Sequence, residues 1–158
     1  MVNVTKSELY NVDIQVLWDL VTEPRALEKF HPFCKENRII TWSDDNRSDC
    51  IVYANDKVFT RNFTEWREKS NFVLDISDGN YDATVEWRID QQEDWSKLTI
   101  TIIPKFLPKN FLIRNLAKIY VRKRLMDYLS DIFKGIEYYI GNNKKVPLNH
   151  FGTHKWFS

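Results

Sequence analysis

Glycine is scarce in this chain, with four residues among 158, at positions 79, 135, 141 and 152. The dinucleotide-binding fingerprint and the phosphate-binding loop both need closely spaced glycines, because side chains would keep the backbone away from the phosphates. With glycines this far apart, the sequence excludes both nucleotide motifs. We therefore expect no nucleotide cofactor, and the sequence implies no cofactor of another kind.

Long apolar runs are also missing. A helix that crosses a bilayer requires roughly 20 consecutive apolar residues, and the nearest run, residues 111–121, is interrupted by two basic residues. Residues 1–10 alternate as a strand does and show no basic-then-apolar leader. The two cysteines, Cys34 and Cys50, have no CxxC spacing. These features predict a soluble protein of a reducing cytoplasm, with unreactive thiols.

Acidic residues are rare in the second half of the chain. Residues 1–94 hold 11 Lys or Arg and 19 Asp or Glu, whereas residues 95–158 hold 12 and 3. Arg114, Lys118 and Arg122 recur at four-residue steps, which places them on one face of a helix. Such a stripe is typical of a solvated outer face, but it also fits an anionic ligand or weak contact with a membrane surface. We expect no nucleic-acid partner.

Seven segments have the composition and the boundaries of β-strands. They span residues 2–10, 38–42, 50–54, 57–67, 71–77, 81–90 and 97–103. In the sixth, apolar and polar side chains alternate, so one face of an antiparallel sheet is buried and the other meets water. A turn over residues 77–80 would pair Ile76 with Tyr81, and the next pairing places Trp87 near Ile100.

Helical patterns lie on both sides of the strand region. Two short helices, residues 14–21 and 25–30, precede the second strand, and a proline follows each of them. A third helical region runs from after Pro108 to about Ile140. Its apolar stripe changes direction near Tyr120, which predicts a bend or a change of packing partner there. We expect the short part before Tyr120 to cover an opening.

The C-terminal residues 141–158 lose the helical pattern. They contain Phe151, Trp156 and Phe157, which are too apolar for a free tail. We expect this tail to dock, either on an outer apolar patch or across the mouth of a cavity.

A sheet followed by one long helix must fold around that helix, which favours a hollow interior over a solid one. The sequence therefore predicts an α+β fold in which a seven-stranded curved antiparallel sheet wraps around a long C-terminal helix. Two short helices lie between the first and second strands, and one domain covers residues 1–158. Aromatic residues make up 15% of the chain, and flat rings suit the walls of a cavity for an apolar ligand.

Several side chains are candidates for contacting such a ligand. In residues 57–67 we take the face with Trp66 as inward, because this leaves the charge of Arg61 in water. Thr60 and Asn62 would then point inward, where their polar atoms need partners or a ligand. The predicted ligand-binding residues are Tyr53, Thr60, Asn62, Trp66, Tyr81, Trp87, Ile100, Met126 and Phe133. Plain core packing is the alternative for the apolar members of this set.

The three histidines are candidates for acid–base catalysis or metal binding. His31 lies where helix meets sheet and is a candidate acid or base, although a structural corner beside Pro32 explains it equally well. His150 and His154 have the spacing of a helical metal pair, but Pro147 argues against a helix there and no third ligand lies nearby. We therefore assign no catalytic and no metal-binding residues.

Four features recur together in one known superfamily. They are Val16-Leu17-Trp18 with Pro24 in the first helices, His31-Pro32 before the sheet, Trp87-Arg88-Ile89 late in it, and the terminal helix. With them the chain resembles the START or Bet v 1-like (SRPBCC) helix-grip superfamily, and most of all its bacterial polyketide cyclase/dehydrase-like branch. The ending at residues 149–158 also resembles members of that superfamily. The resemblance covers nearly the whole chain. It implies a deep apolar cavity between sheet and helix that serves lipids, sterols, polyketides or plant hormones, sometimes with chemistry.

The chain departs from one branch of that superfamily and is similar to another. Residues 43–49 contain no glycine, unlike the glycine-rich loop of the plant pathogenesis-related branch, so the phosphate contacts of that loop are not transferred. The pattern around Trp18 also resembles, more faintly, the Hsp90-activator branch, which implies a chaperone partner as an alternative.

The sequence thus favours binding of an apolar or aromatic small molecule, lipid-like or polyketide-like, without catalysis. One alternative is a cyclase, dehydratase or hydrolase acting on such a ligand, which would need a titratable side chain deep in the hollow. The other is a chaperone-associated or membrane-surface module that uses the basic stripe.

Overall fold

The computed structural model describes residues 2–158. Over this range the chain forms seven strands, β1 (Val4–Tyr10), β2 (Cys34–Trp42), β3 (Arg47–Tyr53), β4 (Val58–Arg67), β5 (Asn71–Ser77), β6 (Asp82–Gln92) and β7 (Trp95–Pro104). The helices of the same range are α1 (Ile14–Thr22), α2 (Leu27–Phe30) and α3 (Phe111–Asn142). The predicted domain also includes Met1, which lies outside the described residues.

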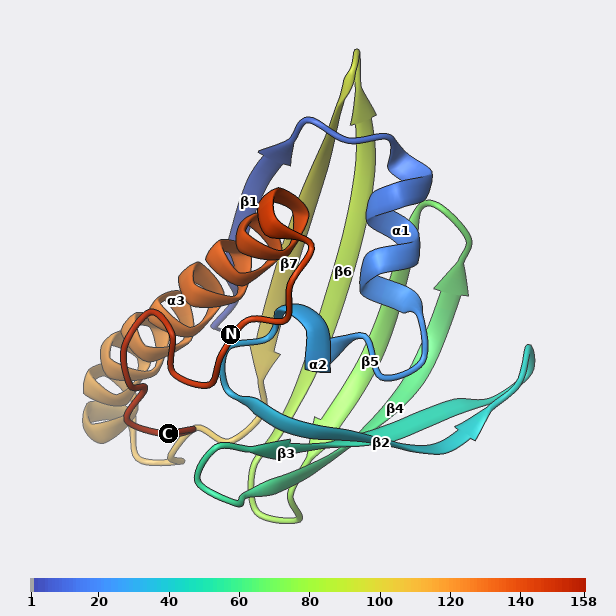
Figure 1. Cartoon of the computed structure of the whole chain (residues 1–158). Coiled ribbons are helices and arrows are strands. Elements are labelled where there is room, and N and C mark those ends of the chain that lie inside the picture. Colours follow the sequence, from blue (N-terminus) through green and yellow to red (C-terminus); the bar gives the residue numbers. More distant parts are fainter. Residues whose placement is uncertain (1) are drawn as a thin grey trace.

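The strands form one antiparallel sheet in the order β1-β7-β6-β5-β4-β3-β2. Figure 1 shows the sheet curving from β1, beside α3, to β2 and β3 at the opposite edge, with the helices on one side of it. Leu17 of α1, Phe30 of α2 and Leu129 of α3 are fully buried between helices and sheet. The predicted α+β fold, with two short helices between the first two strands, is confirmed.

Side-chain caps determine where two of the helices begin. The Asp13 carboxylate accepts a hydrogen bond of 2.7 Å from the backbone N–H of Gln15 at the start of α1. The Asn110 side chain accepts one of 3.0 Å from the N–H of Leu112 at the start of α3. Both caps satisfy amides that have no partner inside the helix.

The pairing of β5 with β6 has the predicted faces but not the predicted register. Ile76 lies opposite Ala83 and not opposite Tyr81, because the connection spans residues 78–81. A shift of two residues keeps every side chain on its face, since the side-chain period of a strand is two. Trp87 lies opposite Ile100, as predicted.

The inward face of β4 was predicted wrongly. Thr60 and Asn62 are exposed, whereas Arg61 is 8% exposed and lies on the inner face. A β-bulge between Phe63 and Glu65 inserts an extra residue and reverses which positions point inward. Trp66 lies beyond the bulge, where the predicted alternation of inward and outward side chains does hold. Its side chain is half-buried.

Helix α3 runs unbroken from Phe111 to Asn142, so the two predicted helical stretches are one helix. Its surroundings change near Tyr120: no residue from 111 to 120 is buried, whereas Val121 and Leu125 are. The predicted change of packing partner is therefore a change from solvent to the protein interior. No helix within residues 2–158 is both long and apolar enough to cross a bilayer.

The C-terminal tail, residues 143–158, is held against the body by backbone hydrogen bonds. The N–H of Val146 donates to the carbonyl of Lys29 at 3.0 Å, and the N–H of Asn149 donates to the carbonyl of Pro32 at 2.8 Å. Farther along, the buried ring of His154 bonds through Nε2 to the carbonyl of Arg124 in α3 at 2.9 Å. These bonds place the tail against α2, the residues that follow it, and α3.

Candidate ligand-binding cavity

A cavity of about 350 Å³ lies between the inner face of the sheet, α3 and the C-terminal tail. Most of its wall is aliphatic or aromatic. The central strands contribute Leu74, Val85 and Ile102, and α3 contributes Leu125 and Leu129. A pocket of this size and composition suits a small apolar ligand.

Four of the nine predicted ligand-binding residues line this cavity, namely Tyr53, Tyr81, Trp87 and Ile100. Whether they contact a ligand stays a prediction. The other five lie elsewhere, and the predicted placement of Thr60 and Asn62 on the inner face is wrong because both are exposed on the outer face of β4.

The remaining three are packing residues in this structure. Trp66 packs edge-on against Trp18 at 5.5 Å between ring centroids and stacks on Phe72 at 5.6 Å. Phe133 is buried and borders a separate surface pocket between β1 and α3. Met126 is partly buried against the core. These three side chains pack in or against the core, and whether any of them contacts a ligand stays a prediction.

A set of four aromatic rings, the aromatic rim, surrounds one end of the cavity. Tyr81 meets Phe106 at 5.2 Å, Phe106 meets Trp156 at 6.4 Å, and Trp156 meets Tyr120 at 6.0 Å. Tyr81 is 52% and Tyr120 41% exposed, so the cavity reaches solvent here. The rim joins the connection between β5 and β6, the loop after β7, the tail and α3.

The tail forms part of the cavity wall. Phe157 stacks on Tyr53 with ring centroids 4.2 Å apart, and both it and Trp156 line the cavity. The end of the tail therefore contributes two aromatic rings to the cavity wall. The first turns of α3 do not cover the opening, because none of residues 111–119 lines the cavity.

One region of the cavity wall, which we name the polar end, contains hydrogen-bonding side chains. His31, which follows α2, bonds through Nε2 to the Tyr128 hydroxyl at 2.8 Å, and that hydroxyl lies 3.1 Å from the Tyr53 hydroxyl. The backbone N–H of Phe33 donates to the other ring nitrogen of His31, Nδ1, at 3.2 Å. We name His31, Tyr128 and Tyr53 the hydroxyl chain.

A buried ion pair stands beside the hydroxyl chain. Arg61 of β4 donates from Nε and Nη2 to the two carboxylate oxygens of Asp49 at 2.7 and 2.6 Å. Asp49 is fully buried on the neighbouring strand β3, directly opposite Arg61. The Asn37 amide donates to the same carboxylate at 2.9 Å.

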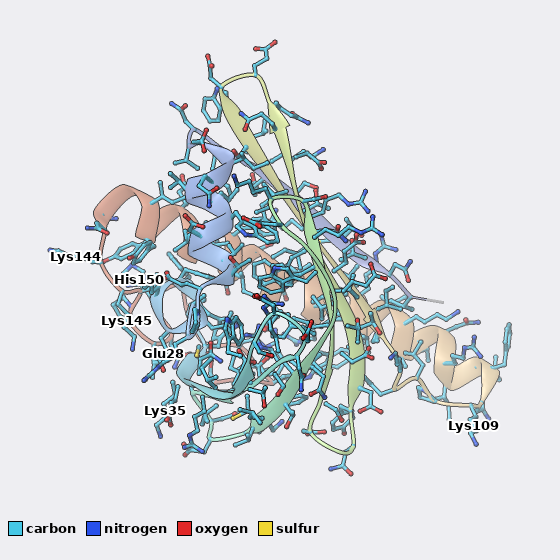
Figure 2. The ribbon with its side chains drawn as sticks, turned by 90° about the vertical axis from the view of Figure 1, so that its right-hand side faces the viewer. Glu28, Lys35, Lys109, Lys144, Lys145 and His150 are labelled. Atoms are coloured by element: carbon cyan, nitrogen blue, oxygen red, sulfur yellow. The ribbon has the colours of Figure 1, made fainter. Side chains whose placement is uncertain are left out.

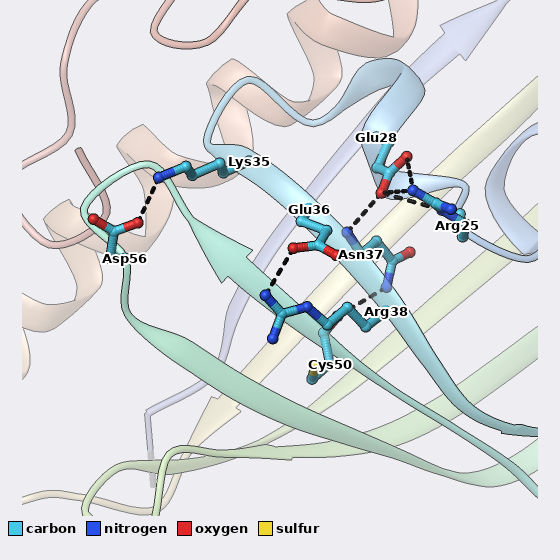
Figure 3. Close-up of polar contacts among 8 residues, drawn as sticks. All are labelled: Arg25, Glu28, Lys35, Glu36, Asn37, Arg38, Cys50 and Asp56. Carbon is cyan, nitrogen blue, oxygen red and sulfur yellow. Dashed lines mark hydrogen bonds and ion pairs between the residues drawn. The ribbon is translucent and has the colours of Figure 1, made fainter.

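Asn37 connects this pair to the helical layer. Figure 3 shows it on β2 between α2 and β3. Its backbone N–H donates to the Glu28 carboxylate at 2.9 Å, and its side-chain amide also donates to the carbonyl of Cys50 at 3.1 Å. The polar end of the cavity is thus held in place by both layers.

Burial determines the protonation states at this end. Burial and the positive charge of Arg61 lower the pKa of His31 to about 3. Burial raises the pKa of Tyr53 and of Tyr128 well above their ordinary value. At neutral pH the imidazole and both phenols are therefore uncharged, and they act as hydrogen-bonding groups rather than as charged ones.

Solved structures share this arrangement of a sheet gripping a C-terminal helix. DynU16, described as a protein in the dynemicin biosynthetic locus, superimposes with a TM-score of 0.73 at 12% identity over 92% of this chain. A START superfamily protein from Mycobacterium smegmatis gives 0.66 at 13% identity, over 89% of this chain and 99% of its own. XoxI from Bacillus cereus gives 0.69 at 11% identity, over 90% and 98%.

This chain has the helix-grip fold. The START and Bet v 1-like architecture predicted from the sequence is confirmed at the level of the fold. The helix-grip chain described here spans 49% of the length of DynU16. No family model matches its sequence, and no curated protein does.

Sequence reasoning missed the polar members of this helix-grip cavity. Arg61 and Tyr128 were not predicted to face it, and His31 was considered only as a corner or an acid–base group. One signal was available: Asp49 directly precedes the apolar run Cys50–Tyr53, and a carboxylate buried there needs a cationic partner on a neighbouring strand.

Proposed function

We propose that this protein binds an apolar or aromatic small molecule, lipid-like or polyketide-like, in the cavity between the sheet and α3. The observation that carries the proposal is the cavity of about 350 Å³ with its mainly apolar wall. Each 100 Å² of apolar ligand surface removed from water would contribute about 2.5 kcal/mol before the costs of ordering. The shared fold of DynU16, from a biosynthetic locus, is consistent with a ligand of this class.

The polar end supports binding over catalysis by proton transfer. A general base works best with a pKa near the operating pH, whereas the pKa of His31 is lowered to about 3. Both of its ring nitrogens already have hydrogen-bond partners. A cyclase, dehydratase or hydrolase acting through this imidazole is therefore the weaker proposal.

Filling the cavity is expected to abolish binding. Ala83 lies in its wall and is 8% exposed, so Ala83→Phe places a ring where the ligand would lie. We expect the apolar fluorophore N-phenyl-1-naphthylamine to bind the natural chain and to bind Ala83→Phe at least about tenfold more weakly, a loss of about 1.4 kcal/mol. Fluorescence titration measures both affinities.

A matched control adds the same ring outside the cavity. Thr60→Phe lies on the exposed face of the neighbouring sheet region and should bind the fluorophore as the natural chain does. Near-ultraviolet circular dichroism checks that both variants are folded. Equal affinity of folded Ala83→Phe and Thr60→Phe would show that the fluorophore binds elsewhere and would contradict the proposal.

A specific surface supports a second role, contact with an anionic membrane. The first ten residues of α3 project from the body, and Figure 2 shows Lys109 at the far end of this projection. Its large apolar side chains are widely exposed: Phe111 73%, Leu112 75%, Ile113 57%, Leu116 73% and Ile119 71%. We name this segment, residues 111–120, the projecting turns.

Basic residues on the projecting turns, and Arg122 directly after them, favour an anionic partner. Arg114 and Arg122 are exposed and Lys118 is half-buried, and within residues 2–158 none of the three forms an ion pair. Exposed apolar side chains interspersed with unpaired cations fit the interface of an anionic bilayer. Each basic residue near such a surface contributes about 1 kcal/mol.

Vesicle co-sedimentation tests this second role. We expect the chain to sediment with phosphatidylglycerol-containing vesicles, less so in high salt, and hardly at all with pure phosphatidylcholine. Combining Leu112→Ser with Leu116→Ser should lower the bound fraction several-fold, whereas Leu148→Ser, an exposed leucine of the tail, should not. Binding that ignores lipid charge and both leucines would contradict it.

A further inference from the structure

The hydroxyl chain has a direction that its first hydrogen bond fixes. The backbone N–H of Phe33 is a donor, so His31 Nδ1, which receives it at 3.2 Å, carries no hydrogen. A neutral imidazole then has its only hydrogen on Nε2. That nitrogen lies 2.8 Å from the Tyr128 hydroxyl. His31 therefore donates to Tyr128.

Each later step follows from the one before it. The Tyr128 oxygen accepts from His31, so its own hydrogen points to its other neighbour, the Tyr53 hydroxyl at 3.1 Å. Tyr53 accepts this bond, and its hydroxyl makes no other hydrogen bond within the described part of the chain. Tyr53 is 2% exposed and lines the cavity. Its hydroxyl hydrogen is therefore left as a donor toward the cavity.

The charge near Tyr53 decides what kind of acceptor fits. Arg61 lines the same cavity, but both oxygens of Asp49 bond to it, so the pair has no net charge. His31 is neutral as well. This end of the cavity thus offers a donor in surroundings without net charge, which favours a neutral carbonyl oxygen over a carboxylate or an ammonium group.

We propose that Tyr53, oriented through Tyr128 and His31, forms a subsite for a carbonyl oxygen on an otherwise apolar ligand. The inference rests on the proposed function, because it names the group by which the bound molecule is oriented. Tyr53 is the contact residue of the subsite, and Tyr128 and His31 are positioning residues. The hydroxyl chain prevents Tyr53 from turning its hydrogen back toward the protein.

Two nearly isosteric probes test the subsite by displacing N-phenyl-1-naphthylamine. 2-Acetylnaphthalene carries a carbonyl oxygen where 2-ethylnaphthalene carries a methylene. We expect the acetyl compound to bind about five- to tenfold more tightly, the ratio that one net hydrogen bond supports. 2-Naphthoate, the anionic counterpart, should bind more weakly than the acetyl compound.

Substitutions assign the preference to one hydroxyl. Tyr53→Phe should remove the preference for the acetyl compound while leaving the affinity for 2-ethylnaphthalene unchanged. Tyr138→Phe, which removes a hydroxyl from a tyrosine of α3 outside the cavity lining, should keep the preference. If the natural chain binds both compounds equally, the subsite is refuted and the cavity proposal stands. If neither compound nor the fluorophore binds, both proposals are refuted.

The direction of the hydrogen bonds in the hydroxyl chain can be measured separately, through the tautomer of His31. Nitrogen-15 chemical shifts distinguish the two tautomers of a neutral histidine. We expect His31 to carry its hydrogen on Nε2 across the neutral pH range. A hydrogen on Nδ1 would reverse every bond in the chain, make Tyr53 an acceptor and overturn the inference even if the cavity binds apolar ligands.

Discussion

Asp49→Ala is expected to destabilise the fold by about 3 to 5 kcal/mol, because removing one partner of a buried ion pair leaves the other charge without compensation. Asp49 is fully buried, and Arg61 is 8% exposed. The substitution also removes the acceptor of the Asn37 amide. Urea denaturation followed by circular dichroism measures the change in the free energy of unfolding.

Two control variants separate the buried charge from loss of an ion pair in general. Glu86→Ala removes the partner of Arg88, a pair at 2.8 Å whose side chains are 31% and 55% exposed, and should cost less than about 1 kcal/mol. Replacing both buried partners, Asp49→Leu with Arg61→Met, should recover most of the lost stability. A double variant as unstable as Asp49→Ala alone would contradict this explanation.

Gly135→Ala is expected to destabilise the fold by about 3 kcal/mol or more, because it forces two helices apart. A Cβ atom at Gly135 would lie 1.9 Å from the backbone oxygen of Phe30 and 3.3 Å from Cδ of Pro32. The first contact involves backbone, which cannot turn away as a side chain can. Since His31 lies between these two residues, the variant should also disturb the hydroxyl chain.

Gly141 provides the matched control within the same helix. A Cβ atom there meets no atom within 4 Å, so Gly141→Ala should leave stability unchanged or raise it by up to about 1 kcal/mol. Thermal unfolding of the two variants side by side measures the difference. Similar melting temperatures for Gly135→Ala and the natural chain would show that α2 and α3 do not pack as closely as described.

The fold was predictable because strand and helix periods are local properties of the sequence. Alternation along β6 placed Trp87 on the inner face, and the turn residues between β5 and β6 bounded both strands. Register was less predictable: the four-residue connection covers residues 78–81, one position later than the expected turn at 77–80, and this places Ile76 opposite Ala83. The faces were unaffected, because a shift of two residues preserves the alternation.

The positions of Arg61 and Tyr128 could not be predicted from the sequence, because they are decided by contacts between separate segments. The bulge after Phe63 reverses the inward face of β4, and a charged residue such as Arg61 reads as solvated until Asp49 is known to lie opposite it. Tyr128 stands on a helix whose rotation against the sheet is decided by tertiary packing. Predicting the hydroxyl chain would have required three segments placed in space at once.

Native mass spectrometry of the protein purified from its own cells tests most directly whether the cavity holds a small molecule. We predict a fraction of the chain with added mass that disappears on denaturation and is absent from Ala83→Phe, and a released compound that is apolar and carries a carbonyl group. An unmodified mass in repeated preparations, together with no uptake of N-phenyl-1-naphthylamine, would contradict a ligand-binding function for this fold.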